Sequence, residues 1–195
     1  MPCKTWGISA NRCKTGGKLA KIKNSICSAC YALRGNYQFA SVKSSHEVRL
    51  QKFNESVEKD GGQSWIAAMK QIIRDDKYFR FFDSGDLQSE KMLDIICQLA
   101  REVPTCKIWL PTKELQLVSK YIYKGNKIPK NLIIRLSAFK FEDAGPVSMA
   151  KKLKVHVSGA SKTVFTCVAP NQDNNCGSCR KCWDKRVMSV VYKRH

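Results

Sequence analysis

The sequence predicts an α/β fold, a small or partial (β/α) barrel-like parallel sheet with cysteine-rich N- and C-terminal loops. Two observations predict it. Apolar strand-like segments alternate with amphipathic helical segments from residue 78 onward, the pattern of parallel strands joined by crossovers. Five or six such units fit into 195 residues, fewer than the eight of a full barrel.

The length of the chain suits one domain with a substantial core. We divide it into an N-terminal cysteine loop (1–38), a βα core (39–166) and a C-terminal cysteine loop (167–195). Strands are expected at 4–9, 78–82, 106–110, 132–136, 154–157 and 163–167. Helices are expected at 44–60, 64–74, 89–101, 114–123 and 147–153. The first of these helices would begin at a Ser44-x-x-Glu47 capping box. The glycine- and lysine-rich residues 11–24 are expected to form a loop.

The cysteines form the most specific pattern in the chain. Cys176, Cys179 and Cys182 form a C-x2-C-x2-C run, and Cys167 lies nine residues upstream. Three thiols at this spacing are typical of ferredoxin-type iron–sulfur ligation. Zinc sites more often use two separated pairs, and the three histidines of this chain form no ligand pair. The run therefore favours a 4Fe–4S cluster over zinc.

A second cysteine group precedes the core. Cys27 and Cys30 form a C-x2-C pair, Cys13 lies upstream, and Cys3 is the eighth candidate ligand. A lone C-x2-C pair is weak evidence, but together with the C-terminal run it gives two groups of four thiols. One or two clusters are compatible with this number. The two remaining cysteines, Cys97 and Cys106, are expected to be small core residues.

Composition narrows the cellular setting and the partners. The first ten residues contain no apolar signal segment and no run is long enough to span a membrane, so we expect a reducing cytosol and reduced thiols. The net charge of +19 comes from 35 basic and 16 acidic residues and favours polyanionic partners, either nucleic acid or an acidic redox protein. A solubilising lysine-rich surface explains the charge equally well. The oligomeric state stays open.

Several polar segments follow predicted strands, and in parallel sheets sites collect at the carboxyl ends of the strands. Asp83, Ser84, Gly85 and Asp86 form the segment best suited to bind a cofactor's amino or hydroxyl group. The alternative is that Asp caps the following helix and Gly permits a tight turn. Cys167 is expected to close the last strand. If the sheet curls, the two cysteine groups would then meet at one mouth of the domain.

Several of these segments together resemble a family of phage proteins known as the gene-product-eighty-eight family. The resemblance rests on residues 5–10 with Cys13, on Cys27-x-x-Cys30-Tyr31-Ala32-Leu33, on residues 80–87, on Thr112-Lys113, and on Cys167-x-Ala169-Pro170 with Cys176, Cys179 and Cys182-Trp183. It implies a phage protein working in the cytoplasm of the infected host. The family is in turn distantly similar to radical S-adenosylmethionine proteins, which implies a barrel-like α/β fold and iron–sulfur ligation.

The chain departs from the radical S-adenosylmethionine pattern in two places. Thirteen residues separate Cys13 from Cys27 where that pattern has three, and no Gly-Gly-Glu segment is present. The leading hypothesis is thus a 4Fe–4S protein with an electron-transfer, redox or structural role. Its ligands would be Cys13, Cys27, Cys30, Cys167, Cys176, Cys179 and Cys182. With so many thiols a cluster could be fully saturated, and no cleavage of S-adenosylmethionine is then expected. The alternatives are a radical S-adenosylmethionine-like enzyme acting on nucleic acid, or a zinc-stabilised nucleic-acid-binding protein.

Overall fold

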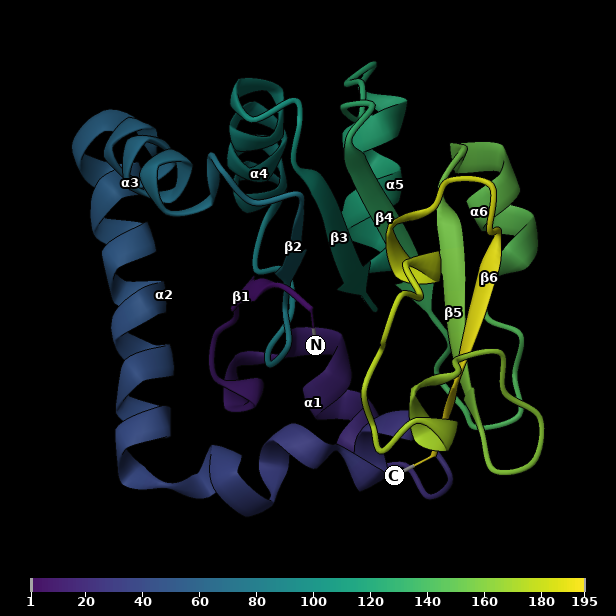
Figure 1. Ribbon diagram of the computed structural model, residues 1–195. Coiled ribbons are helices and arrows are strands. Elements are labelled where there is room, and N and C mark those ends of the chain that lie inside the picture. The colour runs from purple at the N-terminus through teal and green to yellow at the C-terminus, as the bar shows by residue number, and fades with distance from the viewer. Residues whose placement is uncertain (1, 195) are drawn as a thin grey trace.

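Six parallel strands form one sheet in the order in which they occur along the chain, β1-β2-β3-β4-β5-β6. The structure is a computed structural model that describes residues 2–194 (Figure 1). This confirms the predicted α/β class and the all-parallel sheet. The strands are β1 (Lys4–Trp6), β2 (Tyr78–Phe81), β3 (Lys107–Thr112), β4 (Leu132–Ser137), β5 (His156–Ser161) and β6 (Ser189–Lys193).

Helices connect the first five strands. The two helices α2 (Ala40–Asp60) and α3 (Gln63–Ile73) lead from β1 to β2, and the next three crossovers contain α4 (Glu90–Glu102), α5 (Leu115–Tyr123) and α6 (Val147–Leu153). The segment before α2 contains α1 (Lys14–Ala20) and four 3-10 turns, η1 (Ala10–Arg12), η2 (Ile26–Ala29), η3 (Tyr31–Leu33) and η4 (Gly35–Gln38). The last crossover, from β5 to β6, holds only η5 (Ala169–Asn171) and η6 (Lys181–Trp183). The C-terminal cysteines therefore occupy the crossover where the other units have a helix.

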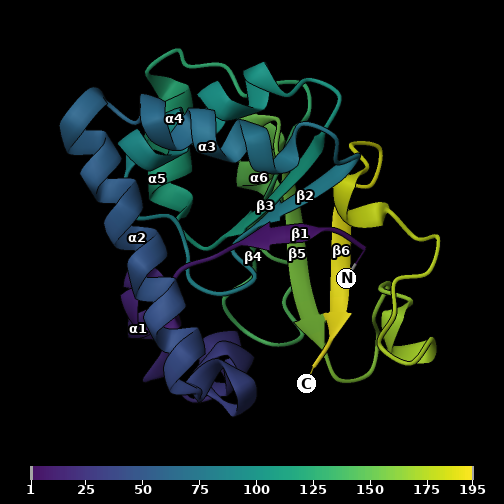
Figure 2. The ribbon, with the colours of Figure 1, turned by 60° about the vertical axis from the view of Figure 1, so that its left-hand side comes forward.

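The two faces of the sheet have different neighbours. In β4, Leu132, Ile134 and Leu136 belong to the hydrophobic core that the helices share, whereas Arg135 and Ser137 point to the other face. Figure 2 shows the helices on one side of the sheet and the C-terminal segment near its β6 edge. The predicted core residues Cys97 and Cys106 are fully buried within the helix-side core, which confirms their assignment.

The face away from the helices is concave. One cavity is lined by side chains from all six strands, which requires the sheet to curve around it. In the described residues β1 and β6 are the two edges of the sheet and no ladder joins them. The structure is thus a curved, open sheet.

The last strand differs from the prediction. Residues 163–167 form no strand, and β6 lies at Ser189–Lys193, beyond the cysteine run. The apolar residues of the predicted strand do not enter the core, because Val164 is 73% exposed. The segment instead meets the edge of β6 locally, where the N–H groups of Thr166 and Cys167 both donate to the carbonyl of Val191. Cys167 therefore does not end a strand.

Two helix boundaries near the N-terminus also differ. Residues 14–20 form helix α1 although a loop was predicted, because tertiary hydrogen bonds to its first turn offset the cost of two glycines. Helix α2 begins at Ala40 and places Ser44 inside the helix, so the predicted capping box is wrong. The other predicted helices agree with the structure to within two residues.

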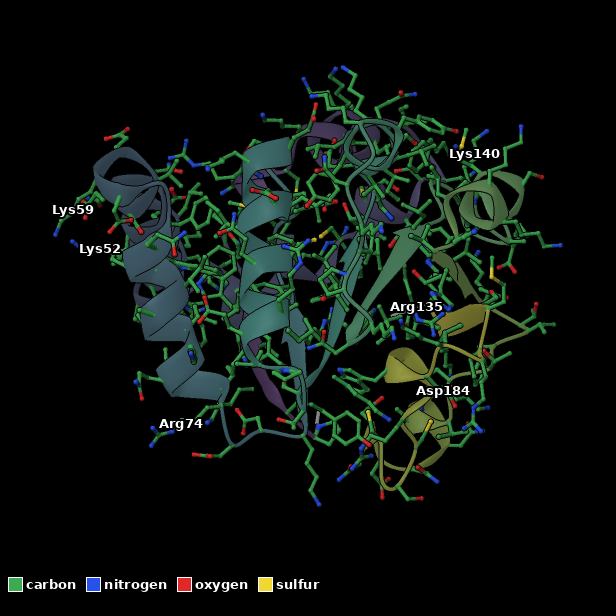
Figure 3. The ribbon with its side chains drawn as sticks, turned by 90° about the horizontal axis from the view of Figure 1, so that it is seen from above. Lys52, Lys59, Arg74, Arg135, Lys140 and Asp184 are labelled. Atoms are coloured by element: carbon green, nitrogen blue, oxygen red, sulfur yellow. The ribbon has the colours of Figure 1, made fainter. Side chains whose placement is uncertain are left out.

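A buried arginine fastens the C-terminal segment to the concave face. Arg135 of β4 is fully buried, and Figure 3 shows it beside the segment that carries Asp184. Its guanidinium donates to the backbone carbonyl oxygens of Lys181 (2.8 Å), Val187 (3.0 Å), Cys182 (3.2 Å), Val157 (3.2 Å), Asp184 (3.3 Å) and Met188 (3.4 Å). Trp183 adds a hydrogen bond from Nε1 to the Phe79 carbonyl at 2.8 Å. These contacts fix the turn that presents Cys182.

Between residues 2 and 194, none of the helices has both the length and the apolarity that crossing a bilayer demands.

Replacing Arg135 with Met should strongly destabilise the protein. The substitution removes the guanidinium donor from six backbone carbonyl groups, of which those of Lys181, Asp184 and Met188 keep a backbone N–H partner. Each carbonyl group that is left unpaired costs about 1–3 kcal/mol. We expect urea denaturation to show the free energy of unfolding lowered by about 3 kcal/mol or more. Arg74→Met is the matched control, because Arg74 forms an exposed ion pair with Asp75 that is worth less than about 1 kcal/mol. Equal effects of the two substitutions would contradict the role assigned to Arg135.

Candidate functional site

A cavity of about 890 Å³ lies on the concave face, extending to the carboxyl ends of the strands. Its volume falls in the range of small-molecule and cofactor sites. The walls come from every strand and from the cysteine-rich segment between β1 and α2. Figure 1 shows this segment across the end of the sheet to which the strand arrows point.

The N-terminal cysteine segment is held in place by the ends of several strands. The carboxylate of Glu114, after β3, accepts hydrogen bonds from the N–H (2.8 Å) and hydroxyl (2.9 Å) of Thr15 in the first turn of α1. Nζ of Lys14 donates to the Gln88 carbonyl after β2 at 2.7 Å. The N–H of Ile26 donates to a carbonyl in the loop after β4 at 2.9 Å. The segment is thus fixed over the cavity from three sides.

Three thiols of this segment line the cavity together: Cys13, Cys27 and Cys30. A Cβ placed on Gly16 would lie 3.5 Å from Sγ of Cys27 and 3.6 Å from Sγ of Cys13. Gly16 therefore keeps open a space that both sulfurs border. By contrast, a Cβ on the neighbouring Gly17 would meet nothing within 4 Å.

The thiols of this group influence one another electrostatically. Burial raises the pKa of Cys13 above its usual value, and the nearby Asp86, Cys30 and Cys27 raise it further. Burial also raises the pKa of Cys27, which Lys113 partly offsets. Cys13 and Cys27 therefore carry their protons at neutral pH, and binding a metal centre would release them.

The segment Asp83–Asp86 takes on two different roles. Asp86 is buried and accepts hydrogen bonds from the hydroxyl of Thr112 (2.5 Å) and the N–H groups of Lys113 (2.8 Å) and Leu87 (2.8 Å). It ties the end of β2 to the end of β3. The predicted helix cap is wrong, because Ser89 caps α4 through the N–H of Met92.

Asp83 and Ser84 have unused hydrogen-bonding capacity beside the cavity. Oδ2 of Asp83 accepts from the Tyr37 hydroxyl at 3.2 Å. Within residues 2–194, Oδ1 of Asp83 and Oγ of Ser84 are buried with no hydrogen-bond partner. Gly85 has a φ of +80°, and a Cβ there would collide with Ile8, which explains the glycine. Buried polar groups without partners in a cavity wall suit a polar ligand.

Cations and aromatic rings make up much of the remaining wall. Arg80 lies over the ring of Trp109 with its guanidinium carbon 4.4 Å from the centroid. At the end of β6, the Arg194 guanidinium lies 4.5 Å from the Phe141 ring centroid. Lys113 donates from Nζ to the Ala138 carbonyl at 2.8 Å. The wall contains more cations than carboxylates, a composition that suits an anionic ligand with a planar group.

The C-terminal cysteines gather elsewhere. None of Cys167, Cys176, Cys179 and Cys182 is among the described residues that line the cavity. Burial raises the pKa of Cys167, and nearby Cys176 and Cys179 raise it further. Burial also raises the pKa of Cys182, to which Cys167 adds. Cys167 thus lies near the other three thiols, but within residues 2–194 the four do not gather closely enough to hold a single metal ion. We refer to them as the C-terminal group.

From the sequence, Cys3 was grouped with Cys13, Cys27 and Cys30, but in the structure Cys3 is also near a C-terminal cysteine. Burial raises the pKa of Cys3 to about 11, and Cys176 is the cysteine that adds to the shift. Cys3 also lines the cavity, but it lies before β1 rather than after it. The predicted meeting of both groups at one mouth assumed that Cys167 ends a strand. In the structure, the Tyr192 hydroxyl lies 3.3 Å from Sγ of Cys182, and Tyr192 also lines the cavity. Tyr192 thus lies between Cys182 and the cavity.

Other important residues gave no signal in the sequence. Arg80, Arg135 and Tyr192 alternate with apolar strand residues. Only the structure shows that Arg80 and Tyr192 line the cavity and that Arg135 binds the C-terminal segment. From the sequence, Gly16 was predicted to lie in a loop. Glu114 was predicted only to begin a helix, whereas its carboxylate accepts hydrogen bonds from Thr15 of α1.

The comparisons with known proteins give one match. A family model described as Gene product 88 covers residues 1–185. The chain belongs to the Gene product 88 family. The match spans both cysteine groups and strands β1 to β5 of this Gene product 88 protein, and it confirms the family resemblance. Searches of curated proteins and of solved structures gave no match.

In this Gene product 88 protein the buried carboxyl of Asp86 should make stability depend on pH. Burial raises its pKa to about 6, against about 4 in an unfolded chain. The folded state then binds this proton more tightly, so the stabilisation is present below pH 4 and is lost as the pH rises through 6. We expect wild type to lose stability relative to Asp86→Asn between pH 4 and pH 7, measured by urea denaturation of both proteins. A wild-type advantage that grows with pH would contradict this.

Proposed function

We propose that this protein is an iron–sulfur enzyme of the reducing cytoplasm of a phage-infected host. In it, Cys13, Cys27 and Cys30 hold a 4Fe–4S cluster that faces the cavity. The observation that carries the proposal is that these three thiols, and none of the C-terminal four, line the cavity of about 890 Å³ on the concave face. Three thiolates leave one iron of a four-iron cluster free to bind a ligand.

The space beside the thiols suits a cluster better than a single ion. Zinc bonds to sulfur at about 2.3 Å, so its ligands almost touch one another. A four-iron cluster is larger, and its ligand sulfurs stand further apart. The space that Gly16 keeps open beside two of the sulfurs fits this larger group.

The cavity favours an enzyme over an electron carrier. A protein that only carries electrons needs no space of about 890 Å³ beside its cluster. S-adenosylmethionine is the candidate cofactor, because a reduced cluster with a free iron would supply the one electron that splits it into methionine and a 5′-deoxyadenosyl radical. That radical would take a hydrogen atom from a substrate and become 5′-deoxyadenosine. Asp83 and Ser84 supply polar atoms without partners that suit its amino group. Cys3 also lines the cavity, but it precedes β1, whereas the other three thiols follow that strand, so a cluster held by Cys13, Cys27 and Cys30 would keep one iron free.

The cationic walls support an anionic substrate. Arg80, Lys113, Lys193 and Arg194 all line the cavity, with aromatic rings between them. Together with the net charge of +19, this favours a nucleotide or nucleic-acid substrate over an acidic redox protein.

The proposal is tested with anaerobically purified full-length protein. Iron and acid-labile sulfide are measured first, and the dithionite-reduced protein is then incubated with S-adenosylmethionine. We expect about four or more irons per chain with matching sulfide, and production of 5′-deoxyadenosine that is lost in Cys27→Ala. Iron and sulfide without 5′-deoxyadenosine would overturn the enzyme and keep the cluster. Zinc without sulfide would overturn both.

A glycine pair in α1 gives a sharper test of where the cluster lies. Gly16→Leu would fill the space beside Cys13 and Cys27, whereas Gly17→Leu points into open space. Both changes improve helix propensity by a similar amount, roughly 0.8 kcal/mol. We expect iron per chain after anaerobic reconstitution to fall to roughly half in Gly16→Leu, because the C-terminal thiols are not affected, and to stay at the wild-type level in Gly17→Leu. Circular dichroism of both variants controls for folding. Equal iron contents would place the cluster away from α1.

A further inference from the structure

The C-terminal cysteine group lies on a segment with several anchoring hydrogen bonds. Arg135 donates to the carbonyl groups of Lys181, Cys182 and Asp184, and Trp183 donates to that of Phe79, so the turn η6 and with it Cys182 are fixed. Cys167 is fixed by its N–H bond to Val191 of β6 at 3.0 Å. Between them lies the Cys176 to Cys179 turn, closed by an N–H to carbonyl bond of 2.9 Å. The four C-terminal thiols thus lie on an anchored segment, and none of them lines the cavity.

Tyr192 joins this group to the cavity. Its hydroxyl lies 3.3 Å from Sγ of Cys182, and its ring lines the cavity. A metal-bound thiolate has no proton to give, so the hydroxyl would be the donor in this pair.

The residues around Tyr192 reach the first cysteine group as well. The rings of Tyr192 and Trp183 lie 6.1 and 5.5 Å from the ring of Trp109, on which Arg80 stacks. Nη2 of Arg80 donates to the Tyr31 hydroxyl at 3.4 Å, and Tyr31 directly follows Cys30. A continuous polar and aromatic network therefore runs from Cys182 to the segment of Cys30.

We propose that Cys167, Cys176, Cys179 and Cys182 hold a second iron–sulfur cluster, and that Tyr192 is the positioning residue that sets its reduction potential from the cavity wall. This proposal builds on the cluster chemistry proposed above but concerns a separate set of ligands. A hydrogen bond to a ligating sulfur stabilises the more negative, reduced cluster and raises its potential. Because Tyr192 lines the cavity, the second cluster would respond to what the cavity holds.

The test isolates the second group in the full-length protein. The triple variant Cys13→Ala/Cys27→Ala/Cys30→Ala is reconstituted anaerobically, and its iron, sulfide and reduction potential are measured. We expect it to retain a cluster, and adding Tyr192→Phe to shift the potential to a more negative value. Tyr123→Phe is the matched control, because Tyr123 is 67% exposed and lies on another element. It should leave the potential unchanged.

Each part of the proposal can fail by itself. A folded triple variant without iron and sulfide would overturn the second cluster. An unshifted potential in Tyr192→Phe would overturn the role of Tyr192. If the triple variant does not fold, a redox titration of the otherwise unmodified protein serves instead, and Tyr192→Phe should move one of two reduction steps. The converse variant Cys176→Ala/Cys179→Ala/Cys182→Ala tests the cavity cluster separately through 5′-deoxyadenosine production.

Discussion

The buried guanidinium of Arg135 is the interaction on which the arrangement of this protein depends. A charge without access to water is costly unless its hydrogen bonds are satisfied, and here backbone carbonyls of the last crossover satisfy them. The crossover from β5 to β6 consequently folds onto the concave face, in place of the helices that cover the other face. As a result, Cys182 contacts Tyr192 and does not line the cavity, whereas the thiols of Cys13, Cys27 and Cys30 do.

The two cysteine groups lie in different environments, and these environments suit different kinds of metal centre. Cys13, Cys27 and Cys30 share a cavity with unpartnered polar atoms and cationic side chains, an environment suited to binding and changing a ligand. The C-terminal group lies apart from the cavity, an environment suited to a stable, fully ligated centre. A basic protein that had only to bind nucleic acid would need neither arrangement. The parallel sheet makes both possible, because all its carboxyl ends face the same way.

Much of the fold could be predicted from the sequence because its signals are local. Apolar strands and amphipathic helices gave the sheet class and most helix positions, and the buried Cys97 and Cys106 were recognised as core residues. The last strand was misplaced because residues 163–167 carry a strand-like pattern whose apolar residues stay exposed. Helix α1 was missed because Glu114, a hundred residues away in sequence, stabilises its first turn. The separation of the thiols depends on such long-range contacts, which spacing alone does not encode.

The most direct test of the central claim, that the two cysteine groups are separate sites, is the iron content of a protein in which Cys167, Cys176, Cys179 and Cys182 are all replaced by Ala. The account predicts that this protein, reconstituted anaerobically, retains about four irons and four sulfides per chain, bound by the remaining thiols at the cavity. Complete loss of iron from the folded variant would show that the thiols at the cavity hold no cluster of their own, and would contradict the account.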